Sequence, residues 1–153
     1  MRTIKQIVAL SAICSLLVMS SCEKEKEDKV VTKTGLVLSG AQEVPVKTTA
    51  AYGTADVSYN KKTRVLTYTV NWNALTGNPT GAHIHGTAPK GVNAPIKHDF
   101  FSLIPKTPAG TFTNAVMVDG VALKEDSLLM GFYYFNIHTQ TNPGGEIRGQ
   151  IEF

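Results

Sequence analysis

Two consecutive stretches of the chain alternate between apolar and polar residues, which is the pattern of strands with one buried face. They cover residues 52–60 and 64–72, and the polar turn NKKT at 60–63 joins them. Their apolar positions are Ala55, Val57, Tyr59, Leu66, Tyr68, Val70 and Trp72. Because successive side chains of a strand point to opposite faces, we expect all of these positions to share the inner face of a β-hairpin.

Shorter apolar runs, separated by turns rich in glycine and proline, follow this hairpin and also precede it. We expect further strands at 35–40, 82–86, 110–118, 131–139 and 146–153, loops at 77–81 and 87–95, and one helical turn at 123–129. Short strands at intervals of roughly 8–12 residues, with almost no helix, are typical of an all-β sandwich or barrel. No segment recurs at a fixed period, which excludes solenoids and propellers.

The last two strands can be aligned more finely. In each strand the aliphatic residues fall on one side and the polar residues on the other. Opposed residues in an antiparallel pair share a face. If the aliphatic sides face the core, His138 lies opposite or diagonal to Glu146, and Asn136 lies near Arg148. A slip of one residue would reverse every face, so this register is a sharp prediction.

The first 21 residues have the pattern of a secretory signal. A basic start is followed by an apolar run that ends at small residues before Cys22. The run is shorter than the roughly 20 apolar residues that span a bilayer. The segment LVMSSC resembles the lipobox of bacterial lipoproteins, although Met19 stands where leucine is more usual. This resemblance implies that Cys22 is acylated and that the lipid anchors the protein to the outer membrane.

Residues 22–34 are expected to form a charged, flexible tether. Their first part, EKEKEDK at 23–29, follows Cys22 directly and cannot bury apolar surface. The same run resembles the charged export tags of some surface-exposed lipoproteins of Gram-negative bacteria. The sequence therefore predicts a protein of the cell envelope, on either the periplasmic or the outer side, whose folded domain covers 35–153.

Charge and cysteine content exclude several classes of protein. The chain carries 15 basic and 12 acidic residues, and removal of residues 1–21 takes away Arg2 and Lys5, which leaves 13 basic residues. No basic stripe is present, so nucleic acid is not an expected partner. Cys14 lies in the signal and Cys22 at its end, so the mature domain has no disulfide and depends on core packing.

Histidine carries the most specific candidate chemistry. His83 and His85, in GAHIHG at 81–86, share one face of a strand, while Ile84 turns to the other. His138 lies on the polar side of a distant strand. Imidazole is a common ligand of zinc and copper, so these three residues form a candidate metal site; solvated histidines on a polar face are the alternative. His98 is expected to be an exposed loop residue rather than a fourth ligand.

Glu146 and Arg148 lie on one face of the last strand and near the candidate histidines. They form either a surface ion pair, usually worth about 0–1 kcal/mol, or an anchor in which Arg148 pairs with Glu43 or Glu146 to hold a loop. We favour the structural role. Within the sequence we find no Gly-x-Ser-x-Gly motif and no phosphate-binding glycine loop. A non-enzymatic role is therefore favoured.

Three segments, 38–60, 81–96 and 133–151, together resemble the CHRD domain, the module repeated in chordin. The third is the most specific, because YYFNIHTQTNPGGEIRG combines aromatic-x-Asn-x-His-Thr with Pro-x-Gly-Glu-x-Arg-Gly. In this chain, the residues that match the motif of the family are Glu43, Val44, Pro45, His83, His85, Gly86, Asn136, His138, Thr139, Gly145, Glu146, Arg148 and Gly149. The resemblance implies an immunoglobulin-like, Greek-key β-sandwich of barrel-like shape, and a function that the family does not define.

GAHIHG also resembles the copper-ligand strand of Cu/Zn superoxide dismutases, which are β-sandwiches as well. A full dismutase site needs more histidines and a disulfide, so only a copper-only variant that includes His98 is conceivable. Three hypotheses follow. The chain is a non-enzymatic lipoprotein module for an unknown protein or small ligand; it binds Cu or Zn through His83, His85 and His138; or it is a copper-dependent, superoxide dismutase-like enzyme.

Overall fold

The alternating segments form the hairpin that their pattern predicts. In the computed structural model, which describes residues 29–153, β2 (Tyr52–Asn60) pairs with β3 (Val65–Asn73) along its whole length. All seven positions predicted for the inner face of the hairpin are buried. The period-two pattern therefore fixed both the pairing and the inner face of this hairpin.

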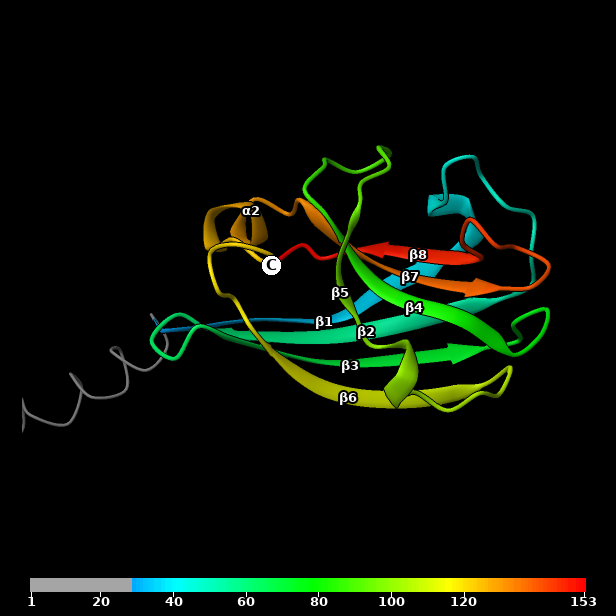
Figure 1. The fold of residues 1–153 in the computed structure, drawn as a ribbon, viewed down its shortest axis with the longest axis horizontal. Coiled ribbons are helices and arrows are strands. Elements are labelled where there is room, and N and C mark those ends of the chain that lie inside the picture. The colour runs from blue at the N-terminus through cyan, green and yellow to red at the C-terminus, as the bar shows by residue number, and fades with distance from the viewer. Residues whose placement is uncertain (1–28) are drawn as a thin grey trace, which may run out of the picture.

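Eight antiparallel strands form one sheet in the order β5-β4-β7-β8-β1-β2-β3-β6 (Figure 1). The remaining strands are β1 (Val30–Ser39), β4 (Pro79–Gly86), β5 (Ile96–Asp99), β6 (Gly110–Met117), β7 (Tyr133–Thr139) and β8 (Ile147–Gln150). The sheet curls so that its two halves pack face to face. The ring of Tyr68 in β3 lies 5.2 Å from that of Phe135 in β7, between centroids. The all-β, barrel-like prediction is confirmed.

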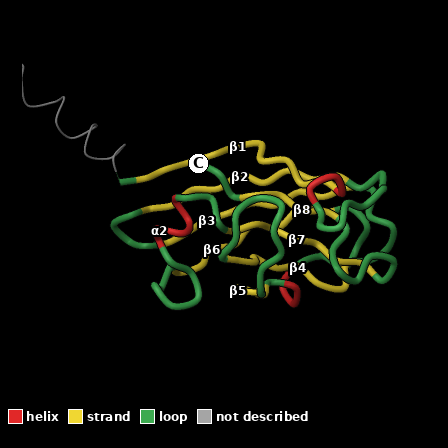
Figure 2. The backbone as a smooth tube through the Cα atoms, turned by 90° about the horizontal axis from the view of Figure 1, so that it is seen from above, coloured by secondary structure: helices red, strands yellow, loops and turns green. Residues whose placement is uncertain are grey.

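Within residues 29–153, helical structure is limited to short turns outside the strands (Figure 2). The predicted helical turn at 123–129 contains the helix α2 (Glu125–Leu129), and two 3-10 turns cover Gly40–Gln42 and Phe101–Leu103. Among the described residues, no helix has the length and apolar character needed to cross a membrane.

The tether predicted over residues 22–34 does not extend to residue 34. Strand β1 begins at Val30, which pairs with Asn60 of β2. The first residues of β1 were not predicted as a strand, because the register shifts between Lys33 and Leu36 and this shift breaks the alternation of apolar and polar residues. The predicted signal (1–21), Cys22 and the first part of the tether lie outside the described residues.

The register predicted for the last hairpin is confirmed. Asn136 pairs with Arg148, and Ile137 pairs with Ile147 in the core. The polar side of this hairpin is nevertheless buried, since Asn136, Arg148 and Gln150 are each at most 3% exposed. The loops at 43–51 and 87–95 cover it: Glu43 contacts Asn136, and Arg148 reaches the loop at 87–95. The outer face of β7 and β8 is thus a second, polar core.

Candidate metal centre

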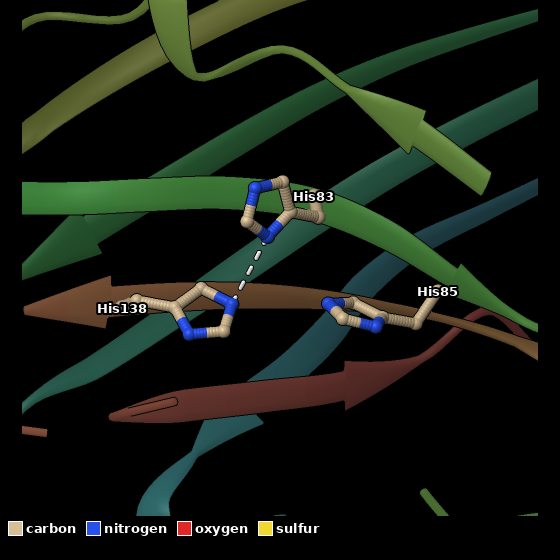
Figure 3. A group of neighbouring side chains, drawn as sticks. All are labelled: His83, His85 and His138. Atoms are coloured by element: carbon tan, nitrogen blue, oxygen red, sulfur yellow. Dashed lines mark hydrogen bonds between the residues drawn. The ribbon is translucent and has the colours of Figure 1, made fainter. Parts of the chain in front are cut away.

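The three candidate histidines lie together on the outer face of two neighbouring strands (Figure 3). Strand β4 carries His83 and His85, and Ile84 between them is fully buried in the core. Strand β7 pairs with β4 and carries His138, which stands opposite Gly81. Antiparallel pairing of strands far apart in sequence therefore gathers these side chains.

One nitrogen of each ring lies within 4.8 Å of the corresponding nitrogens of the other two. His83 Nδ1 and His138 Nε2 form a hydrogen bond of 3.0 Å, and the His85 ring points toward them (Figure 3). Two nitrogens bound to one tetrahedral zinc ion at 2.0–2.1 Å lie about 3.4 Å apart, so the widest separation in the cluster must shorten by up to about 1.4 Å when an ion binds.

Backbone carbonyls fix the orientation of two of the rings. His85 Nδ1 donates to the carbonyl of Ala94 at 2.8 Å, and His138 Nδ1 donates to that of Pro143 at 3.0 Å. A carbonyl only accepts, so both Nδ1 atoms carry the proton and both Nε2 atoms present a lone pair. His85 Nε2 is buried and has no hydrogen-bond partner among the described residues. An uncompensated buried nitrogen of this kind is suited to ligate a cation.

The third ring has an acidic neighbour on its far side. His83 Nε2 lies 3.8 Å from Oδ1 of Asp99 in β5, while His83 Nδ1 faces the cluster. All three rings therefore have one nitrogen turned inward and the other turned toward an oxygen. Metal-binding histidines usually have this arrangement, in which the outer oxygen orients the ring and raises its basicity.

The local environment keeps the imidazoles neutral. Burial, with a smaller contribution from His138, lowers the pKa of His83 to about 4. Burial also lowers the pKa values of His85 and His138 below the ordinary value. The neutral ring is the form that binds a metal, so no net proton is released near neutral pH. The proton by which His83 Nδ1 donates to His138 Nε2 must move to His83 Nε2 before His83 Nδ1 can bind an ion.

Two neighbours of the cluster were not predicted from the sequence. Tyr134 stacks on His85, with ring centroids 5.0 Å apart and planes 5° apart, and the Arg148 guanidinium lies over the Tyr134 ring at 3.4 Å from its centroid. Gly81 leaves space for the rings, because a Cβ there would lie 2.8 Å from His83 Cε1 and 3.1 Å from His138 Cδ2. Tyr134 and Gly81 lie an even number of positions from the histidine of their own strand, so they share its face. This alternation is the sequence feature from which both neighbours could have been predicted.

Glu146 does not join the cluster and instead has the structural role that the sequence favours. Its carboxylate is fully buried and accepts hydrogen bonds from the hydroxyls of Thr49, Thr76 and Thr139 and from the backbone N–H of Thr76. These bonds hold its pKa below the ordinary value although burial acts the other way. Glu146 thereby ties two loops to strand β7.

Arg148 is likewise buried rather than part of a surface ion pair. Its guanidinium donates to the carbonyl of Val92 at 2.9 Å and to Oδ1 of Asn93 at 3.3 Å. It therefore does hold a loop, as expected, but through polar groups of the loop. Glu43 accepts from Asn136, and the charge of Arg148 counteracts the rise in the pKa of Glu43.

His98 lies apart from the other three. It is not a loop residue, because it belongs to strand β5 and pairs with Ile84. This pairing turns it to the inner face, where its Nε2 lies 3.1 Å from the hydroxyl of Tyr68. The four-histidine, copper-only arrangement considered from the sequence is therefore not formed.

A family model for the CHRD domain matches residues 35–151. The chain belongs to the CHRD domain family. No curated protein and no solved structure matches it. The motif residues of the CHRD domain fall into two groups here: Glu43, Asn136, Glu146 and Arg148 are buried and hold loops, and the histidines form the half-buried cluster.

Proposed function

We propose that this CHRD protein is a non-enzymatic module of the cell envelope that binds one copper or zinc ion through His83, His85 and His138. The buried, unpartnered Nε2 of His85 is the observation that carries the proposal. A structural role alone gives no reason to place an unsatisfied polar atom beside two other imidazoles. A bound cation satisfies that atom and also accepts a lone pair from His138.

The chemistry of the donor set favours zinc or copper over harder ions. All three donors are imidazole nitrogens, which suit zinc, copper and nickel better than magnesium or calcium. Three protein ligands leave one coordination position for water or a further ligand. The module can thus hold an ion and present it to a partner, either a protein or a small molecule.

The location in the envelope is proposed from the sequence of the N-terminal segment. Acylation of Cys22 would place the lipid only a short charged segment, residues 23–29, before strand β1. Labelling with palmitate in cells, lost in Cys22→Ser, tests the anchor. Protease treatment of whole cells then distinguishes a domain on the outer surface, which is cleaved, from one in the periplasm, which is protected.

Metal binding is tested with the purified protein, stripped by a chelator and then titrated with Cu²⁺ and Zn²⁺. We expect one tightly bound ion per chain, and loss of that ion in His85→Ala and His138→Ala. His98→Ala is the matched control, because it removes the same side chain from a half-buried site outside the cluster. Absence of stoichiometric metal after loading, or equal retention in all four proteins, would refute the site.

One further measurement distinguishes a redox enzyme from a metal-binding module. If the copper-loaded protein consumes superoxide catalytically, and His138→Ala does not, the module is a redox enzyme rather than a binding protein. Metal binding without turnover supports the proposed function.

A further inference from the structure

A second candidate binding site lies on the outer face of the other half of the sheet. A hollow of about 220 Å³ is lined by Tyr52, Gly53, Thr54, Asn71, Trp72 and Asn73. We call this hollow the β2–β3 slot. It lies three strands away from β7 in the sheet order, so it is separate from the histidine cluster.

Strand alternation explains the shape of the slot. Tyr52 pairs with Asn73, and Thr54 pairs with Asn71, and both pairs point outward. The intervening pair, Gly53 and Trp72, points inward and is buried. Residues two apart in a strand are separated by about 6.6 Å, so the two outward pairs form walls and the backbone between them forms the floor.

One wall is an exposed aromatic ring held in a fixed position. Tyr52 is 56% exposed, and its hydroxyl accepts a hydrogen bond of 3.0 Å from Nδ2 of Asn73. The hydroxyl retains its own proton for a ligand. Across the slot, Nδ2 of Asn71 donates to the hydroxyl of Thr54 at 3.4 Å. The slot thus combines an aromatic face with fixed amide and hydroxyl groups.

The charge of this surface restricts the ligand. None of the six residues that line the slot is charged. A phosphate or sulfate group would find no cation there, and an ammonium group would find no carboxylate. A sugar ring fits the slot better, because its C–H face stacks on an aromatic ring while its hydroxyls bond to amides and hydroxyls.

The neighbouring surface extends the slot across the sheet. Asn71 pairs with Thr111 of β6 on one side, and Thr54 pairs with Val37 of β1 on the other. Four strands at 4.7–4.9 Å spacing make this uncharged row about 14 Å long. A row of this length can hold several units of a chain and not only a single ring.

We propose that the β2–β3 slot binds a neutral polysaccharide, with one sugar ring stacked on Tyr52 and the chain lying along the row from Thr111 to Val37. This site is independent of the metal centre and does not rest on it. A polysaccharide site would let the module attach to a glycan while the histidine cluster stays accessible on the other half of the sheet.

The test uses the purified full-length protein and isothermal titration with neutral hexasaccharides, namely cellohexaose, xylohexaose, mannohexaose and maltohexaose, together with a heparin hexasaccharide as the charged probe. We expect at least one neutral probe to bind and the heparin probe not to bind. Tyr52→Ala should weaken binding about tenfold or more, whereas Tyr52→Phe, which retains the ring, should weaken it less.

Thr113→Ala is the matched control, since Thr113 is exposed on the outer face of β6 but lies outside the slot. It should bind as the unaltered protein does. Four results would overturn the proposal: no neutral probe binds, only heparin binds, Tyr52→Ala binds normally, or the two Tyr52 variants are equally impaired. Thermal unfolding of each variant shows that any loss occurs in a folded protein.

Discussion

Glu43 gives the most direct test of the buried polar core beneath the loops. Its carboxylate is 4% exposed and accepts a hydrogen bond from Nδ2 of Asn136, with the charges of Arg148 and Lys47 nearby. Burial outweighs these favourable contacts and raises the pKa of Glu43 to about 7. The substitution Glu43→Gln keeps the oxygen that Asn136 requires but removes the titration.

The sign and size of the effect follow from linkage. The pKa of Glu43 is about 7 in the folded protein against an ordinary value of 4.5, so the folded state binds the proton more tightly. Protonation of Glu43 therefore contributes stability that is fully present below pH 4.5 and is lost as the pH rises through 7. A pKa difference of this size corresponds to about 3 kcal/mol of unfolding free energy.

Urea unfolding of both proteins between pH 4.5 and 8.5 measures the effect. We expect Glu43→Gln to become more stable relative to the unaltered protein as the pH rises, by about 3 kcal/mol over the range. The histidines have lowered pKa values and act with the opposite sign, but they are present in both proteins and cancel in the difference. A difference that does not change with pH would refute this account of Glu43.

Three further predictions concern the histidine cluster and the loop anchor. Gly81→Ala should lower the metal affinity, measured by titration, about tenfold or more, because the added methyl group displaces the rings of His83 and His138. The unfolding midpoint of this variant should change little. Asp99→Asn should lower metal affinity by about tenfold. Ligation through His83 Nδ1 leaves the ring proton on Nε2, 3.8 Å from Asp99 Oδ1, where a carboxylate stabilises that proton better than an amide does. Unchanged affinity would mean that Asp99 does not act on the ring. Glu146→Gln should lower the free energy of unfolding, measured in urea, by about 3 kcal/mol. The NH₂ group of the new side chain would face the N–H and hydroxyl donors of Thr76 and Thr139, from which it cannot accept a hydrogen bond. A loss below about 1 kcal/mol would contradict the anchoring role.

Local sequence pattern was sufficient wherever one face of a strand is apolar and the other is polar. The hairpin of β2 and β3 has this contrast, and its buried face was predicted residue by residue. The register of Asn136 against Arg148 was also predicted, because a slip would turn Ile137 and Ile147 out of the core. The cost of exposing these apolar side chains can be recognised from the sequence alone.

The pattern failed where the environment of a side chain depends on a distant segment. Strand β5 has four residues, without an alternating pattern, and is recognised only by its pairing with β4. Arg148 and Glu146 have the composition of a solvated strand face. Only the fold brings loops over them and supplies their buried partners.

The sequence by itself determined that His83 and His85 share a face, because a single residue, Ile84, separates them along a strand. It also determined that His138 lies on the polar side of its own strand. Only the tertiary structure decided that β4 and β7 are neighbours, that Glu146 turns away and that His98 faces the interior. The physical reason is that period and polarity are local properties, whereas the distance between two imidazoles depends on which strands pair.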